Sequence, residues 1–191
     1  MDQQVLGQVH KKTKFLARKS KYLDVPTLKL LANALIQNNF DHACSCWYSS
    51  LSKALKDKLQ TAQNKLIRVV LKLPPRKSLY ASHFKALGWL KVEDRVAMFK
   101  IRMVHGVFYD SVPSYFRGYF TRVSDAHTYR TRASDTDVTL YKYKLDTVGK
   151  NTFAYTGASL WNKLPAPLKM IESTNQFKVA LKKWFLDNLE G

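Results

Sequence analysis

The sequence is poor in cysteine, in acidic side chains and in long apolar runs. Two cysteines in 191 residues are too few for a disulfide framework or for a zinc site built from four cysteines. No run of about 18 uncharged apolar residues is present, so no transmembrane helix is predicted. The first 25 residues contain no apolar segment of the kind that a secretory signal needs. Together these absences predict an intracellular protein, nuclear or cytoplasmic and not secreted.

Signatures of catalysis are also missing. Two-metal phosphoryl transfer needs carboxylates gathered around two cations, and acidic residues are close in sequence only at Glu93–Asp94 and at Asp135 and Asp137. Glu93 and Asp94 fall in the first turn of an expected helix, where acids interact favourably with the helix dipole. No G-x-x-x-x-G-K-[ST] loop and no G-x-S-x-G turn occurs. We therefore predict no catalytic residue, no cofactor and no enzymatic activity for this chain.

One short segment leaves a metal site open as an alternative. His42, Cys44 and Cys46 are ligand-type side chains close in sequence, and His83 or His105 could supply a fourth ligand. The Cys-x-Cys pattern alone is too weak to predict zinc. Two small buried thiols in an apolar segment explain it better, so our prediction is that the chain has no metal site.

Positive charge is what the chain has in excess. There are 32 Lys and Arg against 14 Asp and Glu, which gives a net charge of +18. Such a charge destabilises a compact chain by self-repulsion unless an anionic partner neutralises it. Residues 1–80 carry +11 and residues 81–191 carry +7, so the first part is the expected polyanion-binding part. Nucleic acid is the expected partner. An anionic membrane surface ranks behind it, because the first basic segment has few bulky apolar residues for insertion.

Hydrophobic spacing predicts a mainly α-helical fold, a multi-helix bundle of about seven helices. The clearest helix spans 50–73, where apolar side chains recur every three or four residues in one stripe. Pro74–Pro75 is expected to end this helix and to divide the chain into a basic helical bundle, 1–75, and a second helical region, 76–191. The other predicted helices span 5–22, 26–36, 78–87, 92–108, 153–164 and 174–189, with helical turns at 40–48 and 113–120.

The end of the second helix and the polar segment 121–147 need separate predictions. Asn38–Asn39 is expected to end the helix that begins at Pro26. Residues 121–147 are polar and rich in Thr, Ser, Asp and Arg, and they are predicted to form an irregular excursion with a short β segment near 138–141. A loop this long inside a compact domain is uncommon, so the segment is functional, mobile or a pair of strands.

Two basic helical faces form the candidate binding surface. On the first helix the basic residues crowd the polar positions; on helix 50–73 they lie away from the apolar stripe, at spacings of three, four and seven. The first set is Lys11, Lys12, Lys14, Arg18, Lys19 and Lys21, and the second is Lys58, Lys65, Arg68 and Lys72. Charges placed in this way hold a phosphate backbone without reading base sequence, although a solvated basic face remains the alternative.

Two arginines of the polar excursion are further candidates. Arg130 and Arg132, beside Tyr129, could clamp a phosphate or stack on a base. A plain surface loop is the equal alternative for them.

The order of several motifs resembles one protein family. Leu160-Trp161-Asn162-Lys163-Leu164-Pro165 is followed by Leu168–Lys169, Ser173 and Phe177-Lys178-x-x-Leu181-Lys182. This series resembles the extreme C-terminal segment of the reverse transcriptase polyproteins of non-LTR (LINE-type) retrotransposons, of the jockey and chicken-repeat kind. Upstream segments match the same family in the same order: Leu59-Gln60-x-x-Gln63-Asn64-Lys65 with Arg68, Leu87-Gly88-Trp89-Leu90 with Arg95, Pro113-Ser114-Tyr115-Phe116 and Thr131–Arg132.

The resemblance implies the thumb and the post-polymerase helical region of an RNA-directed DNA polymerase. The fingers, palm and endonuclease of the family would lie before residue 1, and no position here matches its catalytic residues. The resemblance also implies partners: RNA, DNA or an RNA–DNA hybrid bound through the phosphate backbone, or a reverse transcriptase core in the parent protein. The alternatives are a structural or interaction module and a non-functional relic of a decayed element. RNA or DNA preference and oligomeric state do not follow from the sequence.

The motif residues are expected to be structural. Trp161 is expected to anchor a small helical core, and Asn162 and Pro165 to form the turn between two helices. The same structural role is expected for Leu164 and Phe177.

Overall fold

The structure, a computed structural model, describes residues 2–109, 111–126 and 136–189. These residues are mainly α-helical, as the apolar spacing predicts, and they contain no strand beyond one isolated β-bridge. They contain more helices than the expected seven or so, because single turns of four residues such as α3 and α4 join the longer helices and are too short to show a periodicity. The chain divides into two compact units, Met1–Val96 with Asn188–Gly191, and Ala97–Asp187.

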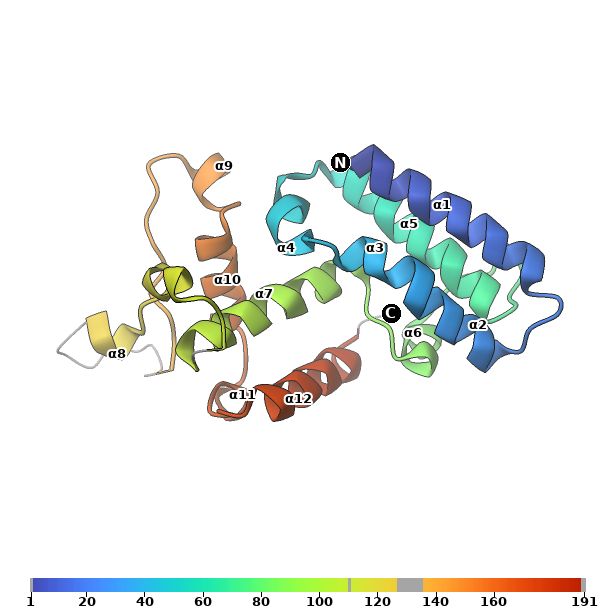
Figure 1. The fold of residues 1–191 in the computed structure, drawn as a ribbon. Coiled ribbons are helices and arrows are strands. Elements are labelled where there is room, and N and C mark those ends of the chain that lie inside the picture. Colours follow the sequence, from blue (N-terminus) through green and yellow to red (C-terminus); the bar gives the residue numbers. More distant parts are fainter. Residues whose placement is uncertain (1, 110, 127–135, 190–191) are drawn as a thin grey trace. The chain divides into compact units, whose positions relative to one another are not determined.

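The first unit is built on three helical segments that lie side by side. They are α1 (Asp2–Lys19), α5 (Lys53–Val70) and the segment α2 (Val25–Ala32), η1 (Asn33–Gln37) and α3 (Asn38–Asp41) (Figure 1). Asp24 begins α2, because its Oδ1 accepts a hydrogen bond from the backbone N–H of Thr27 at 3.1 Å. Ser52 caps α5 in the same way through Leu55. The fully buried side chains between these helices include Leu16, Leu28, Ile36, Phe40, Leu59, Leu66 and Ile67.

The boundary between the units does not fall at Pro74–Pro75, where the sequence suggested it. It falls inside α7 (Val92–Phe108), between Val96 and Ala97. The reason is visible in the hydrogen bonds that cross the prolines. Gln63 on α5 donates its Nε2 to the carbonyl of Leu90 at 2.9 Å, and Gln60 accepts from the N–H of Val92 at 2.9 Å. These bonds tie the start of α7 to the first bundle.

The helix expected to stop at Asn38–Asn39 continues, so that prediction was wrong. The chain widens into the π-turn η1 and returns to α-helix in α3. A π-turn disturbs the regular carbonyl partners, and the two asparagines supply new ones. Asn38 donates its Nδ2 to the carbonyl of Ala34 at 3.0 Å, and Asn39 donates to Leu35 and Ile36 at 3.0 and 2.9 Å. Residues that usually break a helix thus sustain this one.

The α5 helix ends at Val70, before the prolines are reached. Lys72 adopts a left-handed conformation with φ 53°. The N–H of Leu73 bonds to the carbonyl of Arg68 at 2.8 Å, and the N–H of Lys72 bonds to Val69 at 3.3 Å. This pair of bonds is a Schellman motif with a lysine where glycine is usual. The final turn of the predicted apolar stripe therefore unwinds.

The first unit is completed by short elements between and after these helices. They are α4 (Cys44–Trp47), η2 (Tyr48–Ser50) and α6 (Ala81–Leu87), with Gly88 ending α6 at φ 62°. Arg95 at the start of α7 forms an ion pair with Asp41 of α3, with Nη2 to Oδ2 at 2.6 Å.

The second unit surrounds the end of α7. Its further elements are η3 (Ser114–Tyr119), α8 (Val123–Ala126), α9 (Asp146–Gly149), α10 (Phe153–Asn162), α11 (Ala166–Lys169) and α12 (Thr174–Asp187). His105 stacks on Phe177 with ring centroids 3.9 Å apart, and Trp161 lies 6.0 Å from Phe177. Phe177 and Leu181 are buried, while Trp184 and Phe185 are half-buried.

In the described parts of the excursion 121–147, a small antiparallel contact joins two segments that are distant in sequence. Arg122 and Val138 form an isolated β-bridge, and the N–H of Thr139 bonds to the carbonyl of Thr121 at 2.9 Å. Asn162 clamps this point, because its Oδ1 accepts from the N–H of Val138 and its Nδ2 donates to the same residue's carbonyl, both at 2.8 Å. Asn162 is therefore more than a turn residue: its amide pairs with backbone as a neighbouring strand would.

Candidate nucleic-acid interface

The exposed face of α1 carries a row of basic side chains. Lys11, Lys14 and Arg18 are exposed and spaced by three and four residues, so they follow one face of the helix. Val9 and Leu16 lie on the opposite, buried face. The basic row therefore faces solvent because the apolar side of α1 is used by the core.

An aromatic side chain lies within this basic row. Phe15 is 52% exposed. It is three or four residues from Lys11, Arg18 and Lys19, and so shares their face. Spacing alone could have indicated this, since Phe15 follows the basic period of α1 and not its apolar period. An exposed ring among cations offers a stacking surface for a base.

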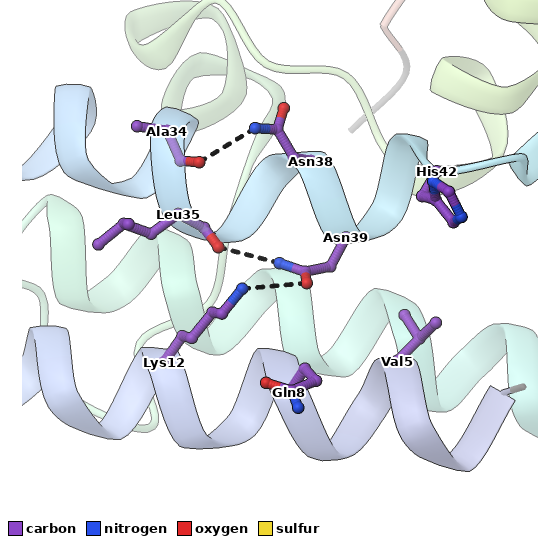
Figure 2. A pocket seen from close by; sticks show the side chains of 8 residues that line it. All are labelled: Val5, Gln8, Lys12, Ala34, Leu35, Asn38, Asn39 and His42. Carbon is purple, nitrogen blue, oxygen red and sulfur yellow. Dashed lines mark hydrogen bonds between the residues drawn. The ribbon is translucent and has the colours of Figure 1, made fainter.

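Lys12 differs from the other basic residues of α1, because a groove holds it. It donates its Nζ to the Oδ1 of Asn39 at 3.2 Å, and Figure 2 shows it reaching from α1 to the helix opposite. The groove has a volume of about 540 Å³ and has the polar side chains of Gln8, Asn38 and His42 along it. Lys12 is thus a positioned donor, whereas Lys11, Lys14, Arg18, Lys19 and Lys21 extend from the surface.

The candidates on α5 and just after it are of two kinds. Lys58 and Lys65 are exposed and two turns apart, roughly 10 Å along the axis. Arg68 is half-buried and donates its Nε to the carbonyl of Lys77 at 2.8 Å. Lys72 lies close to the exposed carboxylate of Asp24. The pKa of Asp24 is lowered first by its hydrogen bonds from Thr27 and in smaller part by the charge of Lys72. Lys58 and Lys65 are therefore exposed cations without a hydrogen bond or ion pair among the described residues, while Arg68 and Lys72 also serve local structure.

Apart from Asp24 beside Lys72, the ion pairs leave these basic faces without acidic partners among the described residues. Two ion pairs of the described chain, Arg95 with Asp41 and Lys169 with Asp137, use other basic residues. Within the ranges that the structure describes, no exposed lysine of α1 or α5 takes part in an ion pair. The charge of these lysines is available to an anionic partner.

Arg130 and Arg132 fall outside the described residues, as do Tyr129 and Asp135. The candidate interface is therefore argued from α1 and α5.

Of the two thiols expected to be buried, only that of Cys44 is, so the prediction was wrong for Cys46. Cys44 is buried, and burial, with the Asp41 carboxylate as a second cause, raises the pKa of its thiol to about 11. Cys46 and His42 are exposed. In the described part of the chain no three His, Cys, Asp or Glu side chains come together in a way that could hold a metal ion.

The family-motif residues are packing and clamping groups in the structure. The Nε1 of Trp161 donates to the carbonyl of Thr136 at 2.9 Å, next to the clamp that Asn162 forms. Leu164 and Phe177 are buried, and Pro165 is exposed at the start of α11. The backbone pairing of Asn162 is a long-range contact that no local spacing could have indicated.

A second basic surface, which the sequence did not suggest, lies between α7 and α12. Met98 and Arg102 from α7 face Lys178, Lys182 and Lys183 from α12 across a groove of about 470 Å³. The spacing of four between Lys178 and Lys182 was the available signal, but the groove needs both helices to be placed.

No helix within the described ranges combines the length and the apolar character needed to cross a membrane. No family model, no curated protein and no solved structure matches this chain.

Proposed function

We propose that the chain binds the phosphate backbone of RNA, DNA or an RNA–DNA hybrid, without reading sequence, through the exposed basic faces of α1 and α5. The observation that carries this proposal is the set of exposed lysines that no described acid pairs with, on two packed helices of one bundle. An intracellular location, where such partners occur, is part of the proposal. So is an origin as the thumb and post-polymerase region of a non-LTR reverse transcriptase, which rests on the motif series alone.

The physical basis is counterion release. Each lysine that neutralises a phosphate of a duplex frees a condensed cation, and the affinity then falls with salt by a slope of about 0.9 per contact. Contacts of this kind fix register and orientation on the duplex and carry no sequence information. The proposal assigns no catalytic step to the chain.

The test is fluorescence anisotropy with a labelled RNA–DNA hybrid hairpin, titrated at several salt concentrations. In the variant Lys58→Gln/Lys65→Gln we expect the slope of log affinity against log salt to fall by roughly 2, since two contacts are lost. The matched control is Lys85→Gln/Lys163→Gln, which removes the same charge from exposed positions outside α1 and α5. Equal slopes in the two variants would show that net charge acts without this surface.

A docking role is the second candidate, because α2 and η1 expose large apolar side chains. Leu30 is 67% exposed and Leu35 40%, and Tyr22 before α2 is 83% exposed. In a longer polypeptide such a face would pack on a polymerase core. Light scattering tests the idea: the docking role predicts self-association that Leu30→Ser/Leu35→Ser abolishes. A monodisperse monomer at all concentrations would argue against it.

A further inference from the structure

The second unit has a surface lined by tyrosine rings. Tyr115 and Tyr119 from η3 and Tyr141 and Tyr143 from the segment before α9 surround a depression of about 500 Å³. Tyr115 is 70% exposed, Tyr119 45% and Tyr141 44%. Exposed large aromatic rings that gather in one place mark a binding surface more often than scattered ones do.

The η3 side of this surface is anchored from beneath. Phe116 is half-buried, and its ring lies 4.6 Å from Tyr115, 5.7 Å from Tyr119 and 6.3 Å from Phe153 of α10. Phe120 is buried and meets Phe153 edge-on at 5.5 Å. Tyr115 and Tyr119 therefore rest on a cluster of aromatic rings.

The other side is held by a close backbone approach. A Cβ at Gly149 would lie 2.2 Å from the ring of Tyr143, so only glycine admits this ring position. Thr152 donates its Oγ1 to the hydroxyl of Tyr143 at 3.1 Å, and Tyr155 meets the ring edge-on at 6.2 Å. Tyr143 forms a fixed wall, beside which Tyr141 remains exposed.

Cations border the rings. Lys142 lines the depression, and it also lines an adjoining one of about 390 Å³ together with Lys150 and Tyr155. Lys144 is exposed two residues further on. Aromatic faces combined with positive charge are the means by which proteins hold single strands, since every base has a π-face and every nucleotide carries a phosphate. A duplex keeps its bases stacked on one another and so cannot use the rings.

We propose that this surface binds unpaired nucleotides, with bases stacked on Tyr115, Tyr119 and Tyr141 and with Lys142 beside the phosphates. The inference rests on the proposed function only in taking nucleic acid as the partner, because it uses a different unit of the chain and a different contact. A proline-rich peptide is the other ligand class that docks in aromatic-lined grooves, and the lysines favour the polyanion.

The experiment compares two labelled strands of equal length and charge, one of oligothymidine and one abasic, with the full chain. Stacking of one base is worth about tenfold in affinity, so we expect the wild-type chain to prefer oligothymidine by tenfold or more. In Tyr115→Leu/Tyr141→Leu this preference should disappear, while the affinity for the abasic strand stays unchanged. Tyr22→Leu, which removes an exposed tyrosine from the first unit, is the control and should keep the preference.

Equal wild-type affinity for the two strands would overturn the inference, and so would a preference that survives in the double tyrosine variant. A tyrosine-dependent affinity for a polyproline peptide, with no preference between the strands, would assign the surface to peptides instead. The hybrid salt slope of Lys58→Gln/Lys65→Gln reports on the proposed function separately. If the base preference fails, the salt slope still tests the proposed function, and if the salt slope fails, the base preference still tests the tyrosine surface.

Discussion

Lys72 occupies a backbone conformation that costs energy for any residue with a Cβ. Its φ of 53° is in the left-handed region, where the Schellman motif at the end of α5 requires it. Side-chain charge and backbone strain can be separated at this position, because alanine and glycine both remove the charge next to Asp24 and only glycine relieves the strain.

We expect Lys72→Gly to be more stable than Lys72→Ala by about 1 kcal/mol, since glycine adopts the left-handed conformation without a steric penalty. Urea unfolding followed by circular dichroism measures the difference. Equal midpoints for the two variants would mean that the lysine at this turn is not strained.

His105 is a buried imidazole, and its two ring nitrogens differ in hydrogen bonding. Its Nε2 donates to the carbonyl of Ile171 at 2.7 Å, while its Nδ1 is buried without a partner among the described residues. Burial lowers the pKa of His105; the hydrogen bond to Ile171 opposes this shift, and the charge of Lys178 adds to it.

Stability should therefore fall on acidification. The unfolded chain takes up the proton near pH 6.5 and the native chain only at a lower pH, so native stability is full above about pH 6.5 and is lost progressively below it. In His105→Gln the loss between about pH 7 and pH 5 should be smaller than in wild type, even if the variant is less stable throughout. Exposed His10→Gln is the control, and urea midpoints across this range decide the matter.

At the scale of the element, the π-turn η1 contains an unusual buried amide. Gln37 is 1% exposed, and neither its Nε2 nor its Oε1 has a partner in the described chain. Gln63 of α5 is equally buried, but its amide donates to Leu90 and accepts from Gln60. The first unit thus contains two equally buried glutamines, of which only Gln63 has hydrogen-bond partners for its side-chain amide.

The same substitution should have opposite effects at the two sites. Gln37→Met removes an unsatisfied amide and should stabilise the chain by about 1 kcal/mol. Gln63→Met leaves the carbonyl of Leu90 without its donor and should destabilise the chain by about 2 kcal/mol, while the Gln60 amide keeps its bond to Asn64. Chemical denaturation of both variants measures this. Destabilisation at Gln37 of similar size would show that its amide is bonded in solution, for example to a buried water.

Local spacing predicted those elements whose signals are local. The helix expected at 92–108 has those bounds, and Gly88 ends α6 because only its left-handed conformation closes the turn there. The π-turn was missed because Asn38 and Asn39 act on carbonyls inside the helix, which a helix-breaking residue is not expected to do.

The candidate surfaces also differ in whether local spacing could predict them. The basic rows of α1 and α5 could be predicted because the residues of each row belong to one helix. The tyrosine surface joins η3 to residues 141–143, and the clamp by Asn162 joins α10 to Val138; both depend on contacts between distant segments. Such contacts follow from packing, which a single sequence does not display.

At the scale of the whole molecule, both units carry the same sign of charge. Of the net +18, residues 1–96 with 188–191 carry +11 and residues 97–187 carry +7. Self-repulsion at this level opposes the compact state, and salt screens it, with a Debye length of about 10 Å at 0.1 M.

Salt should therefore act in opposite directions on folding and on binding. Between about 20 mM and about 200 mM NaCl we expect the urea midpoint to rise, because repulsion in the native chain is screened, while hybrid affinity falls through counterion release. Urea is the denaturant of choice because guanidinium would itself screen the charges. A midpoint that stays constant across this range would show that native-state repulsion is negligible.

The α7 helix belongs to both units, since the division falls between Val96 and Ala97 without a break in its hydrogen-bonded turns. Proteases cleave a segment only after it has left its helix and become extended. Mild digestion should therefore spare this boundary and cut elsewhere, so stable fragments will not coincide with the two units. A recombinant version of either unit would best carry the whole of α7, because a terminus placed inside that helix would leave the cut turns without their partners.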